Sequence, residues 1–195
     1  APAPARTGSL YGRAPPRVAL QGMSGVGNPH PATRLARRTP GGGGAGVGSG
    51  FMHRPPRRSR RLQGFRFLVV PGDNAATRLG ALDEVFHDEP VDGVIHVVAN
   101  GHATPRRPAG TTGTATATRE EQVAAELEDW AITSHRIASM AVRREKPVWL
   151  VIAVTKTDLY ANEIDDVVHY YSPESGSPFG DKIDELRALA GGAKL

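Results

Sequence analysis

A run of glycines near the start of the chain has the spacing of a phosphate-binding loop. The segment Gly22–Gly27 follows the pattern G-x-x-x-x-G and comes directly after the apolar stretch Arg17–Gln21. Glycines allow the backbone to wrap around a phosphate, and successive N–H groups then form an anion-binding nest at a helix start. A glycine-rich turn without a ligand is the alternative. The residues expected to contact phosphate are Gly22, Ser24, Gly25, Val26 and Gly27.

The two residues after this glycine frame lack the side chains that phosphate chemistry needs. A working loop continues with Lys and then Ser or Thr, whereas this chain has Asn28 and Pro29. Asn28 has no charge to offer a phosphate, and Pro29 has neither an N–H for the nest nor a hydroxyl for magnesium. The sequence therefore predicts weak phosphate binding that does not depend on Mg²⁺.

Apolar strands that alternate with amphipathic helices surround this loop. Such alternation indicates an α/β fold with a mainly parallel, doubly wound sheet and flanking helices. Ligands of such sheets bind at the carboxyl ends of the strands. The expected strands are 17–21, 65–70, 91–100 and 148–155, and the expected helices are 74–86, 119–144, 162–170 and 179–190.

A second motif follows the most apolar strand. Thr155-Lys156-Thr157-Asp158 resembles the guanine-recognition motif [NT]-K-x-D of the P-loop GTPases. The resemblance implies that the Lys156 stem packs over the base and that the Asp158 carboxylate accepts hydrogen bonds from guanine N1–H and N2–H₂. Thr155 belongs to the same motif, and a solvated polar loop is the alternative. The implied ligand is GTP or GDP.

The strand at 65–70 resembles the family strand that ends in D-x-x-G. Gly72 takes the place of the glycine that senses the γ-phosphate, but Val69 replaces the aspartate linked to magnesium. Neither Thr33 nor Thr39 is framed as the family's switch threonine. The resemblance thus implies a GTPase-like domain that is inactive or weak in hydrolysis.

The resemblance divides the chain into four segments. The base-closing motif and the last strand and helix of the family have no counterpart before Leu195, so the domain resembles one cut off at its C-terminus. The expected segments are a disordered 1–16, a first strand and phosphate loop at 17–27, a disordered basic segment at 28–64, and the remainder of the domain at 65–195.

Charge is distributed unevenly along the chain. Residues 1–72 contain twelve Arg and no acid, whereas all twenty acids lie in residues 73–195. Nucleic-acid binding is not expected, because the stretch 54–61 has no interleaved aromatic residue to stack on bases. Residues 28–61 are rich in Arg, Pro and Gly, and two explanations stay open: a genuine basic linker, or translation out of frame of a GC-rich gene.

Composition excludes several other classes of protein. The chain has no Cys, so disulfide scaffolds and thiolate metal sites are excluded. No His pair has the i,i+3 or i,i+4 spacing of a helical metal site. The residues 1–10 have no apolar signal region, and no apolar run reaches about 18 residues, so we expect a cytoplasmic protein without a membrane span.

Several residues have a structural interpretation. We expect His96 to be a satisfied core histidine, Trp130 and Trp149 to be core residues, and Leu79 to face the core with Leu82. The acids of the long helix are expected on its solvated face: Glu120, Glu121, Glu126, Glu128 and Asp129.

The resemblance therefore implies a guanine-nucleotide-binding, GTPase-like domain. The alternative is a scaffold or interaction domain that binds no nucleotide, keeps the GTPase fold as a frame, and contacts an acidic protein partner through its basic arm. A third alternative is a truncated product that does not fold stably, because loss of the last strand exposes a sheet edge.

Overall fold

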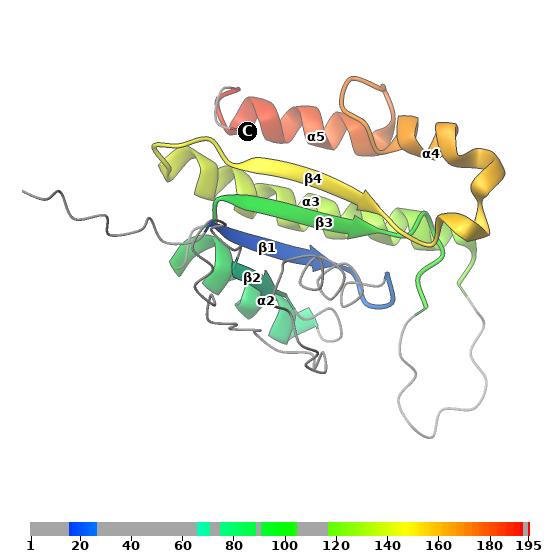
Figure 1. Ribbon diagram of the computed structural model, residues 1–195, viewed down its shortest axis with the longest axis horizontal. Helices are drawn as coiled ribbons and strands as arrows, with labels where there is room; N and C mark the ends of the chain where they lie inside the picture. Colours follow the sequence, from blue (N-terminus) through cyan, green and yellow to red (C-terminus); the bar gives the residue numbers. More distant parts are fainter. Residues whose placement is uncertain (1–15, 27–65, 71–74, 89–90, 105–116, 193–194) are drawn as a thin grey trace, which may run out of the picture.

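The computed structural model describes residues 16–26, 66–70, 75–88, 91–104, 117–192 and 195. In these residues an α/β fold forms around a parallel sheet of four strands in the order β2-β1-β3-β4 (Figure 1). The strands are β1 (Arg17–Gly22), β2 (Arg66–Val69), β3 (Gly93–Val98) and β4 (Trp149–Val154). Of the expected disordered segments 1–16 and 28–64, all residues except 16 lie outside the described residues.

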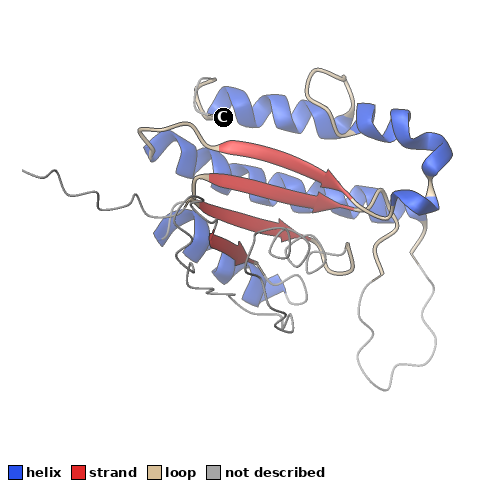
Figure 2. Ribbon diagram, in the orientation of Figure 1, coloured by secondary structure: helices blue, strands red, loops and turns tan. Residues whose placement is uncertain are grey.

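Helices flank this sheet (Figure 2), and from β2 onward the described helices alternate with the strands along the chain. The four expected helices are confirmed, with small shifts at their ends. The first helix continues into a π-helical turn, and the third is preceded by two 3₁₀ turns, η2 (Thr157–Leu159) and η3 (Ala161–Glu163). The other elements are α2 (Ala75–Asp83), the π-helical turn η1 (Glu84–Asp88), α3 (Arg119–Arg143), α4 (Ile164–Tyr170) and α5 (Pro178–Leu189).

Local sequence explains where the two longest helices begin. Thr118 forms a capping box at the start of α3: its hydroxyl accepts the N–H of Glu121, and the Glu121 carboxylate accepts the N–H of Thr118. Ser177 caps α5 by accepting the N–H of Gly180, and Pro178 occupies the first helical position, where no N–H is needed.

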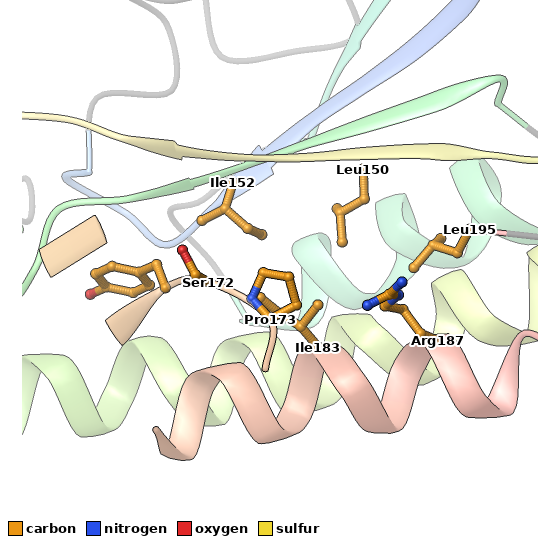
Figure 3. A pocket seen from close by; sticks show the side chains of 8 residues that line it. Leu150, Ile152, Ser172, Pro173, Ile183, Arg187 and Leu195 are labelled. Carbon is orange, nitrogen blue, oxygen red and sulfur yellow. The ribbon is translucent and has the colours of Figure 1, made fainter. Parts of the chain in front are cut away.

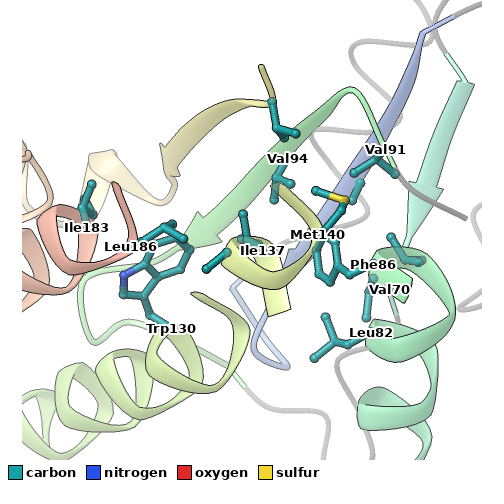
Figure 4. Close-up of a cluster of buried hydrophobic side chains, with 14 of the residues drawn as sticks. Val70, Leu82, Phe86, Val91, Val94, Trp130, Ile137, Met140, Ile183 and Leu186 are labelled. Atoms are coloured by element: carbon teal, nitrogen blue, oxygen red, sulfur yellow. The ribbon is translucent and has the colours of Figure 1, made fainter. Parts of the chain in front are cut away.

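The main core lies on one face of the sheet. Side chains alternate between faces along each strand, so Ala19 and Leu68 point toward the helices while Leu20 and Val69 point away. The helix-side cluster joins α2, α3 and α5 to the sheet (Figure 4). The described helices contribute to this face, and the doubly wound arrangement with helices on both faces stays a prediction. Members of the cluster include Leu82, Phe86, Val94, Trp130, Ile137, Met140, Ile183 and Leu186.

The opposite face carries a smaller cluster that includes part of the glycine-containing segment after β1. Val26 and Ala103 are buried there against Leu20, Val97 and Ala99. Two segments that follow different strands are thereby packed onto the same face, close to the carboxyl ends of β1 and β3.

Two hydrophobic residues lie elsewhere than expected. Leu79 is 39% exposed, because Arg78 and Leu82 take the inward positions of α2. Trp149 is also 39% exposed, since it lies on strand β4 at the edge of the described sheet, where its ring covers Gly93. The predictions for Trp130 and His96 are confirmed, because both are buried.

Candidate functional site: the carboxyl edge of the sheet

The strands point in one direction, so the segments that follow β1, β3 and β4 gather at one edge of the sheet (Figure 1). Gly25 adopts a left-handed φ of +82° in the segment after β1. A Cβ at this position would lie 2.3 Å from the carbonyl carbon of Thr104, in the segment after β3. Only glycine fits both the conformation and the contact.

Thr155 connects the ends of three strands. Its hydroxyl lies 2.6 Å from the carbonyl oxygen of Val26 and 2.9 Å from that of Val98, within hydrogen-bond distance of both. Its N–H also donates to the carbonyl of Val98, at 2.9 Å. The T-K-x-D segment is thereby fixed against the glycine segment, although β3 separates β1 from β4 in the sheet.

Lys156 extends this connection to the segment after β3. The residue has a left-handed φ of 58°, and its ammonium donates to the carbonyl of His102 at 2.5 Å and to the hydroxyl of Thr104 at 2.9 Å. Burial lowers the pKa of Lys156. Thr104 in turn donates its N–H to the carbonyl of Gly25, at 3.1 Å. Asp158 is exposed in the 3₁₀ turn η2.

Tyr160 contacts two of the same loops, the one after β3 and the one after β4. Its hydroxyl donates to the carbonyl of Thr155, and its ring stacks on His102 with centroids 5.2 Å apart and planes 16° from parallel. Burial raises the pKa of Tyr160 to about 12, so the hydroxyl keeps its donor proton at ordinary pH. The buried nitrogens Asn100 Nδ2 and His102 Nε2 have no hydrogen-bond partner among the described residues.

A buried ion pair supports the end of β1. Arg78 of α2 donates to the carbonyl of Gly22 at 2.5 Å, to Gln21 Oε1 at 3.1 Å and to Asp129 Oδ2 at 2.6 Å. Burial lowers the pKa of Arg78 and raises that of Asp129, while the attraction between the two charges opposes both shifts. Gln21 also contacts Nδ1 of His96, whose pKa burial lowers to about 3. His96 is therefore neutral at ordinary pH.

A second buried carboxylate supports the end of β3. Glu126 is 2% exposed and accepts the backbone N–H groups of Ala99 and Gly101, as well as the hydroxyl of Tyr171. Burial raises the pKa of Tyr171, and the nearby Glu126 charge adds to this effect.

The structure brings several of the expected site residues together. Gly25, Val26, Thr155 and Lys156 share one network of contacts at the carboxyl edge. Gly22 lies in the neighbouring group, where its carbonyl accepts from Arg78. Ser24 and Asp158 lie in the same two loops, whereas Gly27, Gly72, Asn28 and Pro29 lie outside the described residues.

The sequence prediction is wrong for two acids and omitted Arg78. Glu126 and Asp129 are not on a solvated face: Glu126 is buried, and the side chain of Asp129 is 15% exposed. The signal in the sequence is spacing, because Glu126 precedes the buried Trp130 by four residues and shares its face of α3. Arg78 has the matching signal, four residues before Leu82.

A cavity of about 320 Å³ lies elsewhere, between β4 and α5 (Figure 3). None of the expected site residues lines it, so it is separate from the loops at the carboxyl edge. Its lining is mainly apolar and includes Leu150, Ile152, Pro173, Ile183, Arg187 and Leu195.

Comparison with known proteins adds no information on the chemistry of this site. No family model, curated protein or solved structure matches the chain. Among the described residues, no group of three or more His, Asp or Glu side chains could hold a metal ion. No described helix combines the length and the apolar character needed to cross a membrane.

Proposed function

We propose that the chain is a P-loop GTPase-like domain that binds a guanine nucleotide at the carboxyl edge of its sheet. The contact between the Thr155 hydroxyl and the Val26 carbonyl, at 2.6 Å, carries this proposal. A phosphate loop and a base-recognition loop serve one nucleotide only if they lie side by side, and the contact between segments 22–26 and 155–158 supports these roles.

The two loops have different parts in binding. Backbone N–H groups of Gly22–Gly27 would hold the phosphates, since the frame offers no cationic side chain. The exposed Asp158 would accept two hydrogen bonds from guanine, which adenine cannot supply, and the Lys156 stem would cover the base.

Hydrolysis is not expected from this site. Phosphoryl transfer in this class depends on a loop lysine and on Mg²⁺ held by a hydroxyl and an aspartate. Asn28, Pro29 and Val69 occupy those positions. We therefore expect weak nucleotide binding that does not depend on Mg²⁺, with negligible turnover.

Titration calorimetry with GDP, GTP and ATP, with and without Mg²⁺, tests the proposal. We expect binding of GDP and GTP but not ATP, and loss of this preference in Asp158→Ala. Asp165→Ala is the matched control, because Asp165 is an exposed acid on the neighbouring helix α4. Equal affinity for GDP and ATP, or no binding by a folded chain, would contradict the proposal.

A scaffold that binds no nucleotide is the second candidate, and one observation favours it. The Lys156 ammonium and the Gly25 carbonyl already have hydrogen-bond partners within the chain, so these two groups need no ligand to be satisfied. The double substitution Asn28→Lys with Pro29→Thr separates the two candidates. It should strengthen GDP binding if the rest of the site is competent, and should change nothing in a scaffold.

A further inference from the structure

One buried carboxylate lies beneath the loops at the carboxyl edge. Glu126 Oε1 accepts the N–H of Ala99 at 3.1 Å and that of Gly101 at 3.3 Å, while Oε2 accepts the Tyr171 hydroxyl at 2.7 Å. None of the ion pairs formed by the described residues includes Glu126. The charge is therefore satisfied by three neutral donors rather than by a cation.

These hydrogen bonds hold a turn of unusual backbone conformation. Asn100 and Gly101 both have left-handed φ values, of 51° and 76°. At Gly101 a Cβ would lie 2.5 Å from the carbonyl oxygen of Arg119, so the turn also lies close against the start of α3. Such conformations persist only where the surroundings fix them. The Glu126 carboxylate fixes this turn from both sides, through the N–H groups of Ala99 and Gly101.

The turn directs the segment that joins the two candidate ligand loops. Directly after the turn, the carbonyl of His102 and the hydroxyl of Thr104 accept hydrogen bonds from the Lys156 ammonium. The N–H of Thr104 donates to the carbonyl of Gly25. A shift of the turn would move His102 and Thr104 together. It would thereby release Lys156 on one side and Gly25 on the other.

We infer that Glu126 is a positioning residue: by fixing the turn at 99–101, it sets the distance between the Lys156 loop and the glycine loop. It touches no ligand itself. A carboxylate suits this role because both oxygens accept and neither needs a donor proton of its own. What the two loops bind rests on the proposed function, but the positioning itself does not.

Substitutions at Glu126, with matched controls on α3 and directly after α4, test this inference. Glu126→Ala removes all three hydrogen bonds, whereas Glu126→Gln keeps one oxygen for Ala99 and Gly101. Ser134→Ala is the control on the same helix, because the buried Ser134 hydroxyl donates to the Ala131 carbonyl within α3 and to no other described residue. Tyr171→Phe removes the third donor and leaves the turn bonded.

Amide hydrogen exchange measured by NMR on the ligand-free chain is the first readout. In Glu126→Ala we expect the Thr104 amide to exchange about tenfold faster relative to the Leu20 amide of β1, since its support is lost. Glu126→Gln should restore most of the protection. Ser134→Ala and Tyr171→Phe should leave the ratio unchanged. An equal change at Thr104 and Leu20 would show a general loss of stability and would overturn the inference.

The GDP dissociation constant is the second readout. We expect it to rise about tenfold in Glu126→Ala and to recover in Glu126→Gln, with both controls unchanged. If the unsubstituted chain binds no GDP, the proposed function fails, and the exchange ratio alone decides the role of Glu126. If Glu126→Ala does not fold, Glu126→Asp takes its place, because the shorter side chain withdraws the carboxylate from the N–H groups of Ala99 and Gly101. A faster Thr104 exchange in Glu126→Asp than in Ser134→Ala then supports the inference, and equal exchange overturns it.

Discussion

The two sides of the carboxyl edge are supported by carboxylates of the same helix, but their charges are satisfied differently. On the β1 side, Asp129 is paired with the buried cation Arg78. On the β3 side, Glu126 accepts two backbone N–H groups and one hydroxyl. The acids lie three residues apart on α3, so one rigid element holds both sides.

This difference predicts how much stability a substitution on each side should cost. Removing one member of a buried ion pair leaves the other charge without compensation, and the cost is large. Removing one of several neutral donors leaves the remaining hydrogen bonds in place, so the cost is smaller. A single substitution on the β1 side should therefore lower the free energy of unfolding by a large amount, and one on the β3 side by a smaller amount.

The largest expected effect is that of Arg78→Met. Asp129 then stays buried and unpaired, and we expect the free energy of unfolding to fall by about 3–5 kcal/mol. Urea unfolding measures this change. Arg136→Met is the control, because its partner Asp83 is 62% exposed and such pairs contribute under about 1 kcal/mol. Similar costs for the two variants would remove the contrast between the sides.

The second largest effect is expected from the dependence of stability on acid pH through His96. His96 has a pKa of about 3 in the folded chain and an ordinary value near 6.5 when unfolded. Between these values the unfolded chain binds a proton that the folded chain does not. The free energy of unfolding should therefore fall below pH 6.5, by about 2 kcal/mol at about pH 5.

Urea unfolding at several pH values checks this prediction, and His96→Gln should flatten the dependence. The comparison stops near pH 5 because burial raises the pKa of Asp129, and protonation of that acid opposes the trend at lower pH. If the free energy of unfolding of His96→Gln depends on pH as strongly as that of the unsubstituted chain, another group on the β1 side titrates instead.

A smaller effect is expected from Tyr171→Phe on the β3 side. Glu126 loses one donor and keeps two, so we expect a loss of about 1.5 kcal/mol in the free energy of unfolding. Tyr170→Phe is the matched control, since the two rings are neighbours in an edge-to-face contact and Tyr170 is only partly buried. Thermal unfolding of both variants measures the difference. A loss in the free energy of unfolding as large as that of Arg78→Met would contradict the smaller cost expected on the β3 side.

The smallest effect is expected from Thr155→Val, which removes the hydroxyl shared between Val26 and Val98. We expect a cost of about 1 kcal/mol, because other bonds still hold both loops. Thr157→Val, at an exposed position of the same loop, should be neutral within error. Chemical unfolding measures both, and a neutral Thr155→Val would mean that packing alone joins the loops.

The sequence predicts the elements of this fold better than the polar contacts beneath the site. Alternating apolar strands and amphipathic helices indicated the parallel sheet, and the rule for strand ends placed Gly22–Val26 and Thr155–Asp158 at one edge. Whether an acid of α3 is buried depends on the rotation of the helix against its neighbours. Residue type does not separate Glu126 from Glu128; only the four-residue spacing to Trp130 places the first on the buried face.

The contrasting surroundings of the two tryptophans give the protein a built-in optical reporter. Trp130 is fully enclosed between His96 and Phe179, whereas Trp149 is 39% exposed on the edge strand. A polar quencher such as acrylamide therefore reaches one indole and not the other in the folded chain. The emission that becomes quenchable during denaturation is therefore that of Trp130, and it reports melting of the core without any added label.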